Sequence, residues 1–206
     1  YTIYSDNHDN IWVGCYGGGL NLLQQTPEGK VYFINHRNKL QNYPFSTCHN
    51  VRYITGTENG ILLIGTAFGL LTFSNDFAQP EEIKFYRNIQ NKNNPLSLTG
   101  NDIMHIYEDS RKAIYVLTFT GGVNKITSRT LLSEDIEFQY YTEQEGLSSD
   151  MVLSMIEDPK KNLWIASENA LSKFNPETEA FENYDTRFLR PVSYTHLRAH
   201  ETDQYL

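Results

Sequence analysis

Residues 154–166 have the sequence Ser-Met-Ile-Glu-Asp-Pro-Lys-Lys-Asn-Leu-Trp-Ile-Ala, in which two apolar runs flank a short polar turn. The first run ends at Glu157 and Asp158, and the second is centred on Trp164. Short runs rich in β-branched and aromatic residues, separated by turn-forming residues, are typical of antiparallel strands. This stretch therefore predicts a β-hairpin with an acidic turn.

The same pattern occurs three more times along the chain. The residues equivalent to Trp164 are Trp12, Leu63 and Tyr115, at spacings of 63−12=51, 115−63=52 and 164−115=49 residues. Six residues before each of these four positions stands a turn residue: Asp6, Thr57, Asp109 and Asp158. A period of about 40 to 50 residues is typical of the blades of a β-propeller.

Each repeat contains short apolar runs, which in the last copy span residues 151–156, 163–167, 171–175 and 180–184. No window has a long 3.6-residue apolar period, so we expect no helix before the C-terminal tail. Four strands per repeat predict an all-β fold, a β-propeller fragment of about four four-stranded antiparallel blades. The blades are expected to span roughly residues 1–40, 41–92, 93–144 and 145–190. Because Tyr1 lies inside an inner strand, we expect part of a larger propeller rather than a closed four-bladed ring.

The aspartates of the repeated turns are interpreted as architectural. An Asp at the head of a tight turn can accept hydrogen bonds from the backbone N–H groups that follow it. Asn10 and Asn162 are expected to take a positive φ near the far end of their turns, as Gly60 does in the second repeat. The residues equivalent to Trp164 are expected to be buried between blades, because a single blade cannot bury both of its faces.

The composition argues against several classes of protein. The 206 residues carry a net charge of −8 and no basic stripe, which disfavours nucleic acid as a partner. No apolar run approaches the roughly 18 residues that a membrane span needs, so no membrane contact is expected for this segment. Cys15 and Cys48 do not make a disulfide framework. We expect two separate thiols, with a bridge across adjacent blades as the alternative.

Residues 191–206 have no blade pattern and are interpreted as a non-propeller tail. Residues 192–202 resemble a translated sequencing adapter, so the tail is interpreted as an artefact and left out of the fold prediction. His196 and His200 have a spacing that can bind zinc on one helix face, but no third ligand is evident. No metal and no cofactor are therefore predicted.

The repeats resemble those of the two-component regulator propeller family. Residues 156–158 and 162–166, with the sequences Ile-Glu-Asp and Asn-Leu-Trp-Ile-Ala, are similar to its Ile-x-Glu-Asp turn and Asn-Leu-Trp-Ile-Gly-Thr strand. Residues 10–14 and 17–22 are similar as well, and residues 145–150 resemble the linker that leads into each blade. The second repeat departs from the pattern, with Leu63 in place of Trp and Thr57 in place of Asp.

This resemblance implies a function. Propellers of the family are normally seven-bladed and typically form the periplasmic sensor region of hybrid two-component systems in Bacteroidetes, where many sense oligosaccharides. The partners implied are a glycan-derived small ligand and the remaining blades and signalling modules of a parent histidine kinase that forms a homodimer. The segment itself is implied to be a sensor without catalytic residues.

A ligand is expected on one face, where the loops between second and third strands meet the linkers between blades. Tyr16, Phe68 and Phe119 occupy nearly equivalent loop positions, and aromatic rings suit the apolar side of a sugar. The alternative is that these rings plug the channel or pack between blades. Polar residues expected on the same face are His49, Asn101, Asp150, Glu168 and Asn169.

Two other classes of function stay open on sequence grounds, because fold does not decide function. A propeller enzyme such as a glycan lyase or glycosidase would consume its ligand, and a glycosidase needs two facing carboxylates. A protein-interaction platform would bind a protein partner and ignore glycans.

Overall fold

The computed structural model describes residues 1–185, so the predictions for the tail, including His196 and His200, lie outside the described residues. The described chain folds into four four-stranded antiparallel sheets, each with its strands side by side in chain order, which confirms the all-β prediction. Sheet 1 contains β1 (Thr2–Ser5), β2 (Ile11–Cys15), β3 (Gly19–Gln25) and β4 (Val31–Ile34). Sheet 2 contains β5 (Val51–Gly56), β6 (Ile61–Thr66), β7 (Gly69–Ser74) and β8 (Tyr86–Asn88).

Sheets 3 and 4 repeat this plan. Sheet 3 contains β9 (Ile103–Glu108), β10 (Ile114–Thr118), β11 (Gly122–Ile126) and β12 (Phe138–Tyr141). Sheet 4 contains β13 (Val152–Glu157), β14 (Leu163–Ser167), β15 (Ala170–Asn175) and β16 (Ala180–Asp185). The predicted strands of the last repeat differ from these bounds by one residue at most.

Three short helices correct the expectation of no helix before the tail. They are α1 (Phe45–Cys48), η1 (Pro80–Glu82) and η2 (Glu143–Glu145), and all lie in connections between strands. Helices of three or four residues are too short to produce a 3.6-residue apolar period, which is why the sequence pattern does not reveal them.

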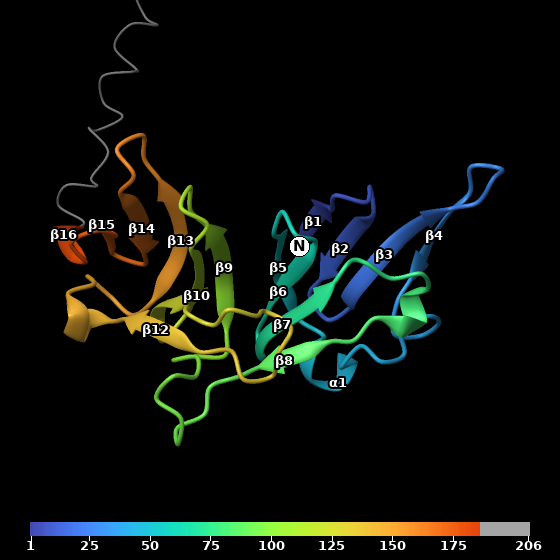
Figure 1. Cartoon of the computed structure of the whole chain (residues 1–206), viewed down its shortest axis with the longest axis horizontal. Helices are drawn as coiled ribbons and strands as arrows, with labels where there is room; N and C mark the ends of the chain where they lie inside the picture. Colours follow the sequence, from blue (N-terminus) through green and yellow to red (C-terminus); the bar gives the residue numbers. More distant parts are fainter. Residues whose placement is uncertain (186–206) are drawn as a thin grey trace, which may run out of the picture.

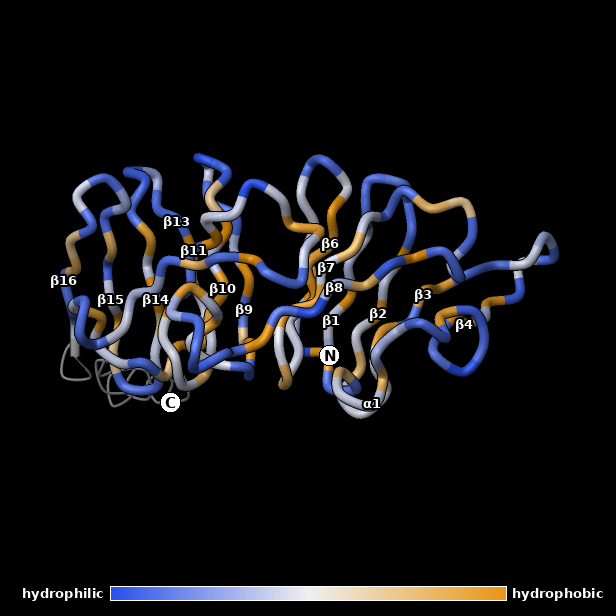
Figure 2. Tube along the Cα trace, turned by 60° about the horizontal axis from the view of Figure 1, so that its bottom comes forward, coloured by the Kyte–Doolittle hydropathy of each residue, from blue (hydrophilic) through white to orange (hydrophobic). Residues whose placement is uncertain are grey.

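The sheets stack in chain order and form an open arc (Figure 1). The inner strands are in contact from β1 to β5, from β5 to β9 and from β9 to β13. Sheets 1 and 4 lie at opposite ends of the described chain in both views (Figure 2). On these end sheets, Ile3 of β1 is 74% exposed and Ile156 of β13 is 63% exposed. The described residues therefore do not close into a four-bladed ring.

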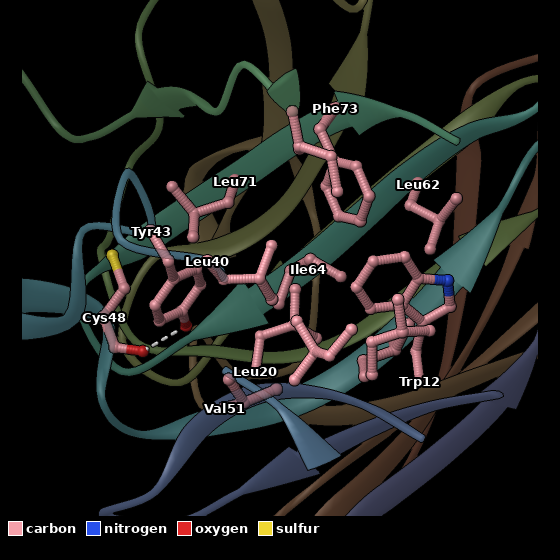
Figure 3. Close-up of a cluster of buried hydrophobic side chains, with 14 residues drawn as sticks. Trp12, Leu20, Leu40, Tyr43, Cys48, Val51, Leu62, Ile64, Leu71 and Phe73 are labelled. Atoms are coloured by element: carbon pink, nitrogen blue, oxygen red, sulfur yellow. Dashed lines mark hydrogen bonds between the residues drawn. The ribbon is translucent and has the colours of Figure 1, made fainter. Parts of the chain in front are cut away.

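The apolar core consists of three clusters, one between each pair of neighbouring sheets. Trp12 packs against Phe73 of sheet 2, with ring centroids 5.0 Å apart (Figure 3). Leu63 and Tyr115 take the same position in the next two clusters, and all three are buried as predicted. Trp164 differs because it is only half-buried, and it stacks on Tyr184 of its own sheet. Its position is the one that faces the next sheet in the other repeats.

The three turn aspartates accept the predicted hydrogen bonds. In each turn, one carboxylate oxygen accepts the N–H groups of the residues two and four positions later, at 2.8–2.9 Å. The other oxygen has a partner that the sequence reasoning missed. It accepts the indole N–H of Trp12 at 2.9 Å in the first turn and that of Trp164 at 3.0 Å in the last.

These hydrogen bonds set the acidity of the turns. Burial alone would raise the pKa of Asp6, but the hydrogen bonds from Trp12 and Asn10 outweigh it and hold that pKa below its ordinary value. The indole hydrogen bond from Trp164 is the main reason why the pKa of Asp158 falls to about 2. Both carboxylates are thus ionised acceptors at neutral pH.

In the first and last turns, the residue with left-handed backbone lies one position before the one expected. Positive φ occurs at Asp9, Lys112 and Lys161, and at Gly60 as predicted. Asn10 and Asn162 instead use their side-chain amides to donate to the turn aspartate. The expectation for the two asparagines was wrong because side-chain hydrogen bonding, not backbone conformation, is what these positions use.

One backbone hydrogen bond recurs between neighbouring sheets. The first residue of β3, β7 and β11 is a glycine with positive φ, and its N–H donates to a carbonyl in the linker that enters the next sheet. The pairs are Gly19 with His49 at 2.8 Å, Gly69 with Asn101 at 2.8 Å and Gly122 with Asp150 at 2.9 Å.

Candidate functional site

The recurring glycine bonds bring the loops between second and third strands against the linkers between sheets. We call this edge of the arc the linker face. It comprises the loops at residues 16–18, 67–68, 119–121 and 168–169 and the linkers at 49–50, 101–102 and 150–151. Further bonds hold the two sets together: the Gly17 N–H donates to Asn50 Oδ1 at 2.8 Å, and the Phe119 N–H donates to the Asp102 carbonyl at 2.8 Å.

The three loop aromatics of the linker face are accessible to different degrees. Tyr16 is 57% exposed and Phe68 is 45% exposed, whereas Phe119 is half-buried. Phe68 lies beside His49, with ring centroids 5.8 Å apart, so these two predicted residues come together. The ring centroids of Tyr16 and Tyr1 lie 5.6 Å apart. Neither of these two tyrosines belongs to the apolar cluster between sheets 1 and 2.

Two of the predicted polar side chains are used to hold the linkers. Asn101 Oδ1 accepts the N–H of Gln90 at 2.7 Å, and Asp150 Oδ1 accepts the N–H of Glu143 at 2.8 Å. Glu168 and Asn169 are exposed at the end of the arc. Each predicted residue thus lies on the linker face, but Asn101 and Asp150 offer a ligand only their remaining hydrogen-bonding capacity.

An ion pair between a strand and a linker of this face was not predicted from the sequence. Arg52 of β5 forms a bidentate pair with Asp102, with Nε–Oδ1 at 2.6 Å and the second N–O distance at 2.9 Å. The same guanidinium lies 5.8 Å from the centre of the Tyr16 ring. A signal for it existed, because Arg52 and Asp102 are one repeat apart, at 102−52=50 residues.

Three titratable groups near this face are already engaged in the structure. Asp102 is paired with Arg52, and Asp150 accepts a backbone N–H. His105 of β9 accepts the Met155 N–H at its Nδ1 atom, 3.3 Å away, and burial lowers the pKa of its imidazole. Such an arrangement of aromatic rings and satisfied polar groups suits binding of a polar ligand.

Two kinds of feature are absent from residues 1–185. Within that range, no helix is long and apolar enough to cross a membrane. The described side chains also include no group of three or more His, Cys, Asp or Glu residues arranged to hold a metal ion. Cys15 is half-buried and Cys48 is buried, and both are free thiols.

Comparison with known proteins identifies the repeat. Residues 146–169 match the family model of the two-component regulator propeller. A histidine kinase of Formosa agariphila is 27% identical over 195 residues, which cover 90% of this chain and 13% of that protein. The chain therefore spans only a small part of the relative it matches.

Solved structures agree on the fold. The extracellular domain of a putative hybrid two-component system from B. thetaiotaomicron matches 92% of this chain and 29% of its own, with a TM-score of 0.51 and 17% identity. Virginiamycin B lyase from Staphylococcus aureus matches 89% of this chain and 54% of its own, with a TM-score of 0.56 and 14% identity. At these identities the likeness shows the fold alone. The resemblance to the two-component regulator propeller repeat is confirmed.

Proposed function

We propose that this chain, which carries the two-component regulator propeller repeat, is the extracytoplasmic sensor segment of a signalling receptor with a histidine kinase as parent protein. The observation that carries the proposal is the match to a histidine kinase over 90% of the chain, combined with the family model at residues 146–169. The similar fold of an extracellular domain from a hybrid two-component system supports a periplasmic location. Further blades and signalling modules of the parent, in a homodimer, would complete the receptor.

The ligand proposed for the linker face is an oligosaccharide that is bound and released unchanged. Tyr16 and Phe68 are exposed aromatic platforms, and Phe119 is a half-buried third ring. His49 beside Phe68, together with Glu168 and Asn169, supplies polar groups for hydroxyls. Arg52 orients Tyr16 through its contact with the ring and is itself fixed by Asp102.

Calorimetric titration with a panel of oligosaccharides tests this proposal. The Tyr16→Ala and Phe68→Ala variants are expected to weaken binding at least tenfold. Tyr140→Ala, which removes an exposed tyrosine from the outer strand β12, should leave binding unchanged. Mass spectrometry of the recovered ligand completes the experiment, because a sensor returns it intact. Cleaved ligand would establish an enzyme instead, and retention of a protein partner without any glycan would establish an interaction platform.

A further inference from the structure

A groove of about 480 Å³ lies between sheets 1 and 2, away from the linker face. Its walls are the first turn of sheet 1, the β3–β4 hairpin and the loop that follows β7. The volume is within the range of about 300–1,000 Å³ that is usual for sites of small ligands. Most side chains that line the groove are polar, in contrast to the apolar cluster between the two sheets. They include His8, Asn10, Gln24, Tyr32, Lys39 and Asp76.

The groove exists because the β3–β4 hairpin is longer than its neighbour. β3 has seven residues and β4 has four, whereas the equivalent strands of sheet 2, β7 and β8, have six and three. The hairpin extends beyond sheet 2 (Figure 1). Leu22 and Ile34 face each other across the hairpin and are buried against sheet 2. The next pair on the same face is Gln24 with Tyr32, and it lies beyond the cover of sheet 2.

Several polar groups of this groove have no partner within the described chain. The amide of Gln24, the hydroxyl of Tyr32 and the carboxylate of Asp76 make no side-chain hydrogen bond to residues 1–185. The Nδ1 atom of His8 lies 3.2 Å from the Asn75 carbonyl, so Nδ1 donates to that oxygen and Nε2 stays available to a ligand. Donors and acceptors are thus both available to a ligand.

The end of the groove is held in place by contacts between the sheets. The Asn75 amide donates to Asn7 at 2.6 Å, and the same asparagine is buried. Phe77, which lines the groove, packs edge-to-face on Trp12 with ring centroids 6.1 Å apart. Since the walls are fixed to the core, a ligand would not have to order them, which favours affinity.

We propose that this groove is a second binding site of the chain and takes a short, uncharged oligosaccharide. Tyr32, which is 44% exposed, would pack its ring on the apolar side of a sugar, while Gln24 and Asp76 bind hydroxyl groups. The charges of Lys39 and Asp76 cancel in the groove, which suits an uncharged ligand. The whole chain carries a net charge of −8, which repels anionic glycans. The site does not depend on ligand binding at the linker face.

An array of immobilised neutral oligosaccharides tests this site, followed by calorimetry of the intact chain with the best-retained glycan. Tyr32→Ala and Asp76→Ala are each expected to weaken binding at least tenfold, whereas Tyr32→Phe keeps the ring and most of the affinity. Asp135→Ala is the matched control, because Asp135 and Asp76 are both exposed and both donate their N–H to the serine two residues earlier. Tyr140→Ala is the control for the ring.

Each outcome decides between the two sites. Loss of glycan binding in the Tyr32 and Asp76 variants but not in Asp135→Ala and Tyr140→Ala establishes the groove. Loss only in the Tyr16 and Phe68 variants overturns the groove and supports the linker face. If the array retains no neutral glycan, or if all variants bind equally, the groove is not a saccharide site.

Discussion

At the scale of single residues, the bond between the turn aspartate and the aromatic side chain six positions later links the turn to the core. Asp6 fixes its own turn with one oxygen and accepts the buried indole N–H of Trp12 with the other. Tyr115 makes the equivalent, longer contact with Asp109, at 3.4 Å. The acidic turn and the aromatic residue that follows it look independent in the sequence, but a side-chain hydrogen bond joins them into one structural unit.

Replacing Asp6 by alanine is expected to lower the free energy of unfolding by about 1–3 kcal/mol, because it leaves the buried Trp12 indole without an acceptor. Urea denaturation followed by tryptophan fluorescence measures the change. Asp135→Ala removes an exposed aspartate of a different turn and should stay within about 0.5 kcal/mol of the parent chain. Equal stability of the two variants would show that the Asp6 bonds contribute nothing.

The backbone half of this unit could be predicted from the sequence, and the side-chain half could not. Turn chemistry depends on residues within four positions, so the role of Asp158 followed from its place before Lys160 and Asn162. The indole bond of Trp164 depends on how a strand leaves the turn, and that geometry is not encoded in residue types alone.

At the scale of strands, the sheets approach closely where a glycine of the second strand faces the inner strand of the next sheet. Gly65 of β6 lies against Ile103 of β9, and a Cβ added at Gly65 would lie 2.7 Å from the Ile103 Cγ2 atom. Gly14 of β2 faces Val51 of β5 in the same way. These positions control how tightly successive sheets stack.

Gly65→Ala is expected to destabilise the chain by about 1–3 kcal/mol through overpacking against Ile103. Ile103→Ala alone should also destabilise, because it leaves a cavity in the cluster between sheets 2 and 3. The free energy of unfolding of the double variant is expected to fall by less than the sum of the two single losses, which thermal or urea denaturation measures. Additive losses would mean that the two residues do not contact each other in solution.

Strand bounds followed well from the apolar runs, but the connections did not. The runs of the last repeat matched β13–β16 closely, since alternation and turn residues define a strand locally. The length of β3 creates the groove beside Tyr32 only because the strands of the neighbouring sheet 2 are shorter. This difference in length involves residues of two repeats, so it cannot be recognised before the packing of the sheets is known.

At the scale of the whole molecule, the arc has an apolar face at each end. Sheet 1 turns Ile3, Ile11 and Phe33 away from sheet 2, and these side chains are 74%, 37% and 44% exposed. Sheet 4 turns Ile156 and Trp164 away from sheet 3. In the three interior junctions, equivalent positions are covered by a neighbouring sheet.

The chain on its own is therefore expected to self-associate through these end faces. Sedimentation velocity should show oligomers that grow with concentration. The double variant Ile3→Lys and Ile156→Lys is expected to shift the distribution toward monomer. Leu96→Lys serves as the control, because Leu96 is an exposed apolar residue of a connecting loop and not of an end face. A parent chain that sediments as a monomer at all concentrations would contradict the prediction.

The sequence could predict which loops lie on the face of the candidate site, but not which of its side chains contact one another. Repeat equivalence placed Tyr16, Phe68 and Phe119 at corresponding loops, and the structure brings Phe68 to His49. The Arg52–Asp102 pair joins two sheets, so residue types within one repeat did not reveal it. Contacts within a repeat follow from local pattern, whereas contacts between repeats require the stacking geometry.

The recurring bonds from Gly19, Gly69 and Gly122 to the linkers have a mechanical consequence. Within the described chain, the sheets are joined one after another, because each inner strand contacts the inner strand of the neighbouring sheet. A small rotation at any one joint moves every sheet beyond it as a rigid arm. Equal rotations at the three junctions between sheets would add up. A displacement that is small at each glycine would therefore produce a larger change in the distance between sheets 1 and 4.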